Sequence, residues 1–162
     1  GDTAYMSWNA TNVYVGYKGF TPLSGETVSV YFGESGGTTT PDGAGHPTLP
    51  RNFPYRLVWK NDTLSASIRM WTPGSPGSWG ATAIPVTLGY TGGAGNDYVD
   101  FSFARSAVGT PTVVYMAGGL VNAAGNAYVS VFPNPPNTNA TWTQSYMFEL
   151  LGAATPKGSA KN

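Results

Sequence analysis

The stretch that decides the fold is residues 27–32, which read Thr-Val-Ser-Val-Tyr-Phe. Valine or phenylalanine at positions 28, 30 and 32 alternates with serine and tyrosine at 29 and 31. This period of two is typical of a β-strand that turns one face toward a core and leaves the other half-exposed. We therefore take this segment as a strand and read the rest of the chain outward from it.

Similar short runs of aromatic and β-branched residues recur along the chain, separated by turns rich in Gly, Pro and Asn. The predicted strands are Tyr5–Trp8, Val13–Tyr17, Thr27–Phe32, Tyr55–Lys60, Leu64–Thr72, Ala83–Tyr90, Tyr98–Phe103, Thr112–Ala117, Ala127–Phe132 and Tyr146–Leu150. Many short strands at this spacing predict an all-β, antiparallel, jelly-roll-like β-sandwich of about nine to eleven strands. Arg105–Gly109 is the one segment expected to form a helical turn, closed by glycine in a left-handed conformation.

The length of the chain predicts one domain. Residues 1–152 are expected to form a single sandwich, and residues 153–162, which lack apolar periodicity, a flexible tail. The chain has no cysteine, and this absence neither proves nor excludes that the protein is exported. Residues 33–52 hold so many glycines and prolines that we expect a long loop, and loops of this length often carry function.

The charge balance excludes several classes of partner. Eight Lys and Arg balance eight Asp and Glu, and charged residues make up 10% of the chain. No basic stripe is available for nucleic-acid phosphates or anionic lipid, so neither nucleic acid nor membrane insertion is expected. Few charges with many Thr, Ser, Asn and Gly are typical of secreted or cell-surface β-proteins, and we predict that location.

Three tryptophans next to predicted loops are the candidate ligand-binding residues. Trp71 and Trp79 flank the turn at residues 73–78, and Trp142 follows the Pro- and Asn-rich loop at 133–139. Flat indole faces held on loops can stack on the C–H face of a sugar. The alternative is that these indoles fill or cap the core, as tryptophans in sandwiches commonly do.

The signals for catalysis are thin. Residues 33–37 match the G-x-S-x-G pattern around Ser35, but the single histidine, His46, lies in the same loop and no helix follows. A glycosidase would need two carboxyl groups at a defined separation. Its candidates are Glu34, Asp97, Asp100 and Glu149. We expect no enzyme activity.

Calcium is the one cofactor left open. The chain has no cysteine and one histidine, which disfavours zinc, whereas carboxylates and loop carbonyls suit calcium. The candidate calcium ligands are Asp2, Glu26, Asp42, Asp62, Asp97 and Asp100. No loop contains the regular acidic run of a dedicated calcium-binding motif, so no metal ligand is assigned.

Two segments resemble a known family. Residues 8–17 (WNATNVYVGY) resemble the opening of family 9 carbohydrate-binding modules and the related DOMON-like sandwiches, with Asn9 where an acidic residue is usual. Residues 98–109 (YVDFSFARSAVG) are similar to a late strand and turn of that family. Residues 30–33, 36–40 and 46–50 are similar to small secreted myxobacterial proteins. The resemblance implies a β-sandwich, and family members variously bind sugars, calcium or haem.

From these observations we predict a secreted, non-catalytic, carbohydrate-binding-like module that uses loop aromatics, with a polysaccharide or glycan as partner. The alternative is a self-assembling structural subunit of an extracellular filament, matrix or surface layer, whose partners are copies of itself. Low charge favours this alternative, because charged side chains are what keep exposed sheet edges apart.

Overall fold

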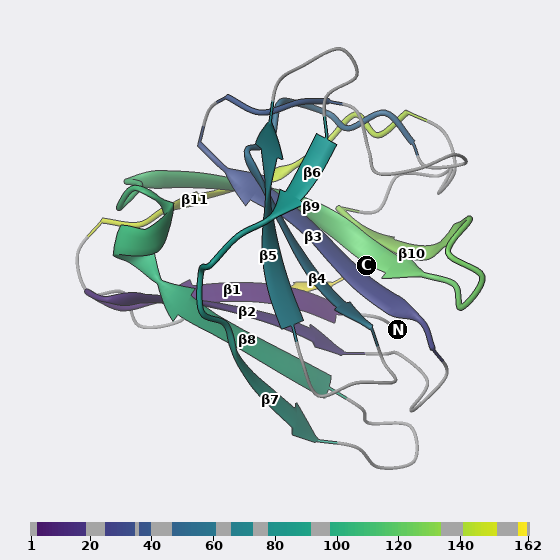
Figure 1. Cartoon of the computed structure of the whole chain (residues 1–162), viewed down its shortest axis with the longest axis horizontal. Helices are drawn as coiled ribbons and strands as arrows, with labels where there is room; N and C mark the ends of the chain where they lie inside the picture. The colour runs from purple at the N-terminus through teal and green to yellow at the C-terminus, as the bar shows by residue number, and fades with distance from the viewer. Residues whose placement is uncertain are drawn as a thin grey trace.

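The computed structural model describes residues 3–18, 25–34, 36–39, 47–60, 66–72, 78–91, 98–133, 141–151 and 159–161. The side chains of 71, 72 and 159–161 are outside this description. Two antiparallel sheets pack face to face (Figure 1), so the predicted all-β sandwich is confirmed. In the part of the chain described, no helix is long and apolar enough to cross a membrane.

The first sheet has five strands in the order β12-β1-β2-β8-β7. Their bounds are β1 Thr3–Trp8, β2 Asn12–Lys18, β7 Thr87–Thr91, β8 Tyr98–Ala104 and β12 Ser159–Lys161. The turn between β1 and β2 is built on Asn9, whose Oδ1 accepts hydrogen bonds from the backbone N–H groups of Thr11 and Asn12. This side chain closes the hairpin locally, as asparagine does in tight turns.

The second sheet has seven strands in the order β10-β9-β3-β4-β5-β6, with β11 also paired to β9. Their bounds are β3 Thr27–Gly33, β4 Tyr55–Lys60, β5 Ala66–Thr72, β6 Ser78–Ala81, β9 Val113–Val121, β10 Tyr128–Phe132 and β11 Tyr146–Glu149. β3 lies between β4 and β9 and is therefore a central strand. The main core fills the space between the sheets and includes Met6, Val15, Phe32, Trp59 and Phe101.

The prediction that β3 is half-buried is wrong. Both of its faces are buried: Val28, Val30 and Phe32 face the main core, while Tyr31 is fully enclosed on the other side. A second hydrophobic cluster covers that outer face. Its members are Tyr31, Leu49, Phe53, Trp79, Ala117, Val121, Tyr128, Val131 and Trp142. This cluster, which we call the outer cluster, comes partly from segments that the sequence predicted as loops.

A polar network makes burial of the second face of β3 possible. The Ser29 side chain is fully buried, and its Oγ accepts a hydrogen bond from Nε of Arg56 at 2.9 Å. The hydroxyl of Tyr128 lies 3.4 Å from the Ser29 oxygen and 3.2 Å from the Tyr31 hydroxyl. Burial raises the pKa of Tyr128 well above its ordinary value, so this phenol stays protonated.

Two glycines let three strands meet beside the network. A Cβ on Gly118 would lie 2.3 Å from the carbonyl oxygen of Ser29 on β3, and one on Gly119 would lie 2.0 Å from the carbonyl oxygen of Ser130 on β10. Real Cβ atoms do not approach backbone this closely, so these two positions require glycine. The consecutive glycines therefore allow β9 to pair with β3 on one side and β10 on the other.

The other predicted elements match the structure except at three places, and the first is β6, Ser78–Ala81, which the sequence did not predict as a strand. Arg105–Val108 forms a single 3₁₀ turn, η1, closed by Gly109 at φ 86°, as predicted. Residues 83–86, predicted as the start of a strand, lie outside β6 and β7, and Pro85 among them cannot donate to a strand ladder. In the tail expected to be free, Ser159–Lys161 pairs with β1 as β12, since strand pairing uses backbone groups and needs no apolar pattern.

Gly118→Ala is expected to destabilise the fold by at least about 3 kcal/mol, because the added methyl group collides with the backbone of β3. Gly80→Ala is the matched control, since its Cβ would lie 4.0 Å from the nearest atom, and it should change stability by no more than about 0.5 kcal/mol. Urea unfolding followed by tryptophan fluorescence measures both. Equal stability of the two variants would contradict the close approach of β9 and β3.

Candidate functional site

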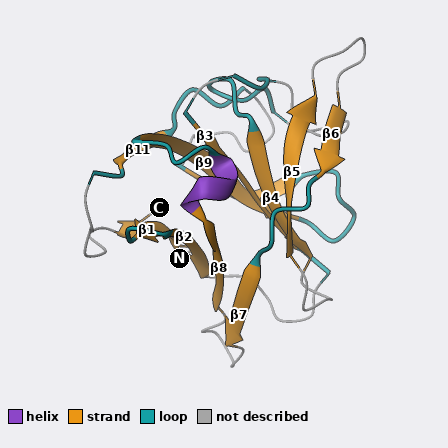
Figure 2. Cartoon of the chain, turned by 60° about the vertical axis from the view of Figure 1, so that its left-hand side comes forward, coloured by secondary structure: helices purple, strands orange, loops and turns teal. Residues whose placement is uncertain are grey.

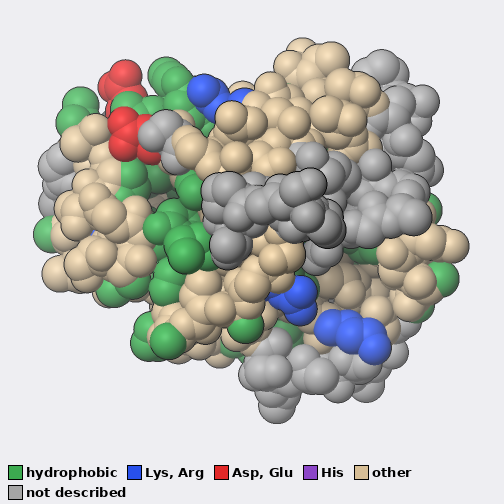
Figure 3. Space-filling model, turned by 45° about the horizontal axis from the view of Figure 1, so that its top comes forward, with side chains coloured by type: hydrophobic (Ala, Val, Ile, Leu, Met, Phe, Trp, Pro, Cys, Tyr) green, Lys and Arg blue, Asp and Glu red, His purple; other side chains and the backbone are tan. Residues whose placement is uncertain are grey.

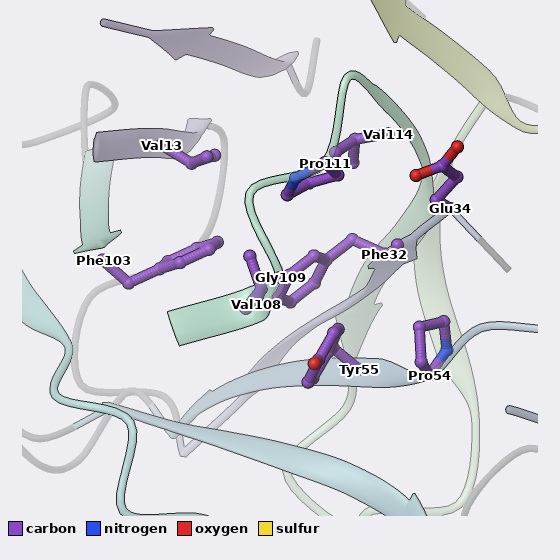
Figure 4. A pocket seen from close by; sticks show the side chains of 11 residues that line it. Val13, Phe32, Glu34, Pro54, Tyr55, Phe103, Val108, Gly109, Pro111 and Val114 are labelled. Carbon is purple, nitrogen blue, oxygen red and sulfur yellow. The ribbon is translucent and has the colours of Figure 1, made fainter. Parts of the chain in front are cut away.

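A cavity of about 190 Å³ lies at the end of the sandwich where β3 and β8 finish and β9 begins. Figure 4 shows its lining side chains converging from strands of both sheets and from η1. The residues that line it are Val13, Phe32, Gly33, Glu34, Pro54, Tyr55, Phe103, Val108, Gly109, Pro111 and Val114. It is the leading candidate for a small-molecule site in the described chain.

The inner wall of the cavity is apolar and aromatic. Phe32 and Tyr55 stack with ring centroids 5.4 Å apart and an interplanar angle of 23°, and Phe103 packs against Phe32 at 5.1 Å. Phe32 and Phe103 are buried, whereas Tyr55 is partly exposed. The three rings come from β3, β4 and β8, so the wall is held by the strand pairing itself rather than by a loop.

Arg105 holds in place the part of the cavity wall that contains Val108, Gly109 and Pro111, which we call the roof. Its guanidinium donates hydrogen bonds to three backbone carbonyls, Asn9 at 3.3 Å, Pro111 at 3.0 Å and Leu150 at 3.0 Å. These acceptors belong to the β1–β2 turn, the segment after η1, and the residue that follows β11. The arginine is 8% exposed, so its charge is stabilised by backbone carbonyls of three separate segments rather than mainly by water. It ties these segments together above Val108 and Pro111.

Glu34 supplies the ionisable side chain of the cavity lining. It follows β3 directly and is exposed, and among the described residues no hydrogen bond or ion pair to its carboxylate occurs. Gly33 before it has φ 136°, and a Cβ there would lie 2.4 Å from the ring of Pro54. This glycine lets the chain turn out of β3 and carry the carboxylate to the rim.

The structure buries two of the three tryptophans predicted to bind a ligand. Trp79 lies in β6 rather than in a loop and is 8% exposed, with its ring 5.6 Å from that of Tyr31. Trp142 is 2% exposed and packs edge-on against Tyr128 at 4.9 Å. Neither indole offers an open face for a sugar. Trp71 pairs with Trp79 through the β5–β6 backbone, but its side chain is outside the described residues.

Most of the residues that are candidates for a catalytic or calcium-binding role lie outside the part of the chain that the structure describes. Ser35, His46, Asp2, Asp42, Asp62 and Asp97 lie outside the described residues. Asp100 accepts a hydrogen bond from the hydroxyl of Tyr5. Burial and this bond raise the pKa of the tyrosine. No group of three or more His, Cys, Asp or Glu side chains that could hold a metal occurs among the described residues.

The second candidate site is the outer edge of β7. This strand pairs with β8 on one side, and no described strand pairs with its other side (Figure 2). Residues 70–96, which include β6 and β7, carry no charged side chain. Charged atoms are likewise sparse among the described atoms on the face of the molecule drawn in Figure 3. The edge thus lacks the lysines and glutamates that commonly block strand pairing between molecules.

Sequence reasoning missed the cavity because its walls come from distant segments. The residues at 13, 32, 55 and 103 are each ordinary core positions in a strand pattern. The one sequence signal near the cavity is the predicted turn at 105–109, because Val108 and Gly109 of that turn are among the lining residues. The sequence offers Glu34 only as one of four candidate carboxylates for a glycosidase; another of them, Glu149, lies across β9, about 10 Å away by two strand spacings.

Comparisons with known proteins identified no protein similar to this chain. No family model, no curated protein and no solved structure matches this chain. The resemblance to family 9 carbohydrate-binding modules therefore stays a prediction.

Arg105→Met is expected to destabilise the protein by about 2–4 kcal/mol, because it removes the charge-assisted hydrogen bonds to three backbone carbonyls, of which those of Pro111 and Leu150 are in buried bonds. Arg51→Met is the control, since Arg51 lies over the ring of Tyr115 at 3.2 Å and its loss should cost about 1 kcal/mol or less. Urea unfolding measures both. An Arg105 variant as stable as the Arg51 variant would show that the roof does not depend on this side chain.

Proposed function

We propose that this domain is a non-catalytic structural module, working outside the cell, that associates with a second copy of itself through its β7 strand. The observation that carries the proposal is the uncharged edge of β7. An exposed strand edge displays unsatisfied N–H and C=O groups, and another strand of the right shape satisfies them. The low overall charge removes the long-range repulsion that would otherwise oppose association.

The sequence of β7 favours pairing with itself. The strand reads Thr87-Leu88-Gly89-Tyr90-Thr91, with polar residues at both ends, apolar residues next and glycine at the centre. In an antiparallel pair related by a two-fold axis at the glycine, threonine faces threonine and leucine faces tyrosine. Threonine pairs and aromatic–aliphatic pairs are both favourable across strands. A two-fold contact of this kind is self-complementary and closes on itself.

Packing within the monomer prepares β7 for this contact. Leu88 and Tyr90 are partly buried and pack against the main core, whereas Thr87, Gly89 and Thr91 are exposed. The inner face of the strand is thus already placed on the core, and a partner strand would extend that core sideways. Five residues form a short ladder, so we expect association at about micromolar to millimolar concentration.

Growth beyond a dimer needs a second edge. β6, Ser78–Ala81, is the edge strand next to β5, lies in the same uncharged stretch and is shorter than β7. By contrast, β1 has its outer side covered in part by β12. Alternating two-fold contacts at β7 and β6 would build a filament, because each copy would then hold two neighbours.

Carbohydrate recognition stays a prediction from the sequence. The burial of Trp79 and Trp142 removes two of the three surfaces on which it depended. No described feature favours carbohydrate recognition over self-association.

Gly89→Lys is expected to weaken dimer formation at least about tenfold, because the two introduced lysines face one another across the two-fold axis. The monomer should fold normally, since a Cβ at this position lies 3.9 Å from the nearest atom, the Cβ of Asp100, and the added ammonium faces that acid. Sedimentation velocity over about a hundredfold range of concentration measures the association. A wild-type chain that stays monomeric throughout this range would contradict the proposal.

Gly80→Lys is the matched variant, because Gly80 is also an edge-strand glycine with space for a side chain. It should leave the dimer intact and remove any larger species. Mixing Gly89→Lys with Gly89→Glu places opposite charges at the axis and should restore association. If Gly80→Lys abolishes the dimer while Gly89→Lys leaves it unchanged, the contact lies at β6 and the β7 assignment is wrong.

A further inference from the structure

We propose that the end cavity binds a small ligand made of one hydrocarbon or aromatic ring carrying a protonated amine, with the ring inside and the ammonium at Glu34. This inference is independent of self-association. It depends on three features of the described structure: the volume of the cavity, the chemistry of its inner wall, and the position of the one ionised group that lines it.

The volume sets the size of the ligand. An apolar cavity of roughly 150 Å³ is known to accept a benzene molecule. The 190 Å³ here therefore leaves space for one ring and a short chain. A larger ligand would have to displace Val108 or Pro111, whose segments Arg105 ties to the rest of the fold.

The inner wall selects an apolar ring. Four buried residues form most of this wall and offer no side-chain hydrogen-bonding group: Val13, Phe32, Phe103 and Val114. A ligand that carries hydroxyl groups on every side would lose its hydration there without replacement, at a cost of a few kcal/mol for each group. A hydrocarbon or aromatic ring loses nothing and gains the burial of its surface.

The rim selects a cation. Among the described lining residues, Glu34 is the one that carries a carboxylate, and Figure 4 places it at one side of the group of apolar side chains. Two cations lie on neighbouring elements. The guanidinium of Arg105 is engaged by the backbone carbonyls of three segments, and Arg51 lies over the ring of Tyr115. That ring packs against the outer cluster, on the opposite face of the sheet from Phe32 and Val114. Arg51 is therefore on the wrong side of the sheet to neutralise Glu34 at the cavity.

The aromatic rings support the same charge preference. The partly exposed Tyr55 stands at the wall next to Pro54, and the faces of aromatic rings attract cations. An ammonium between the carboxylate of Glu34 and the ring of Tyr55 would gain both interactions. A carboxylate or phosphate on the ligand would meet repulsion from the same groups.

The test uses three probes of nearly equal shape: phenethylamine, the neutral 2-phenylethanol and the anionic phenylacetate. Chemical-shift titration and calorimetry on the intact chain measure their binding. We expect the amine to bind most tightly, by about three- to tenfold over the alcohol, and the anion most weakly. High salt should reduce the advantage of the amine without changing binding of the alcohol.

Two variants separate the rim from the wall. Glu34→Gln should remove the advantage of the amine and leave the alcohol unchanged, while Glu26→Gln, the same change just before the other end of β3, should have no effect. Val108→Phe should fill the cavity and abolish binding of all three probes. Chemical shifts of residues far from the cavity show whether each variant is folded.

Three results would overturn the proposal. If none of the probes shifts the signals of the lining residues, the cavity takes no ligand of this class. If the alcohol binds the wild type as tightly as the amine does, Glu34 does not select a cation. If a neutral methyl glycoside binds more tightly than the amine does, the site recognises sugar and the carbohydrate prediction is favoured instead.

Discussion

Burial of both faces of β3 is the constraint on which the rest of the structure depends. A strand covered on both sides cannot leave its polar groups to water, so the Ser29 hydroxyl needs a partner within the protein, and the Arg56 side chain provides it. That arginine must itself be enclosed, and the phenols of Tyr31 and Tyr128 complete the polar group around it. Removing the Arg56 side chain would take away the donor to the buried Ser29 hydroxyl, and the loss of a buried partner costs more than the bond contributes.

The outer cluster explains why a chain of this size has so many aromatic residues. A sandwich with one core needs apolar side chains on one face of each sheet, but this protein also packs rings on the outside of its larger sheet. The backbone N–H of Trp142 donates to the carbonyl of Thr48 at 2.9 Å, so two segments with no strand character are joined over that sheet. Phe53 and Trp142, the large aromatic residues of these two segments, are buried in the outer cluster.

The strand pattern of the fold could be predicted from the sequence because alternation is a local property. The alternation in β3 identified its inward residues correctly, and the glycine after η1 marked the end of that turn. What the sequence could not show is what covers the second face of a strand, since Tyr31 reads as an exposed aromatic until Trp79 and Trp142 are placed beside it. The cavity was hidden for the same reason: Phe32 and Phe103 become neighbours only when the two sheets meet.

The antiparallel register of β7 and β8 has a consequence for how a pair of these domains would act. The cavity lies at the end of β8, beyond Phe103, whereas a two-fold axis at Gly89 would stand beside Asp100. Such an axis reverses the direction of every strand in the second copy. The two cavities would then open at opposite ends of one continuous sheet. Such a pair would be bivalent: it could crosslink two separate ligand-bearing surfaces, but its two sites could not both bind the same surface.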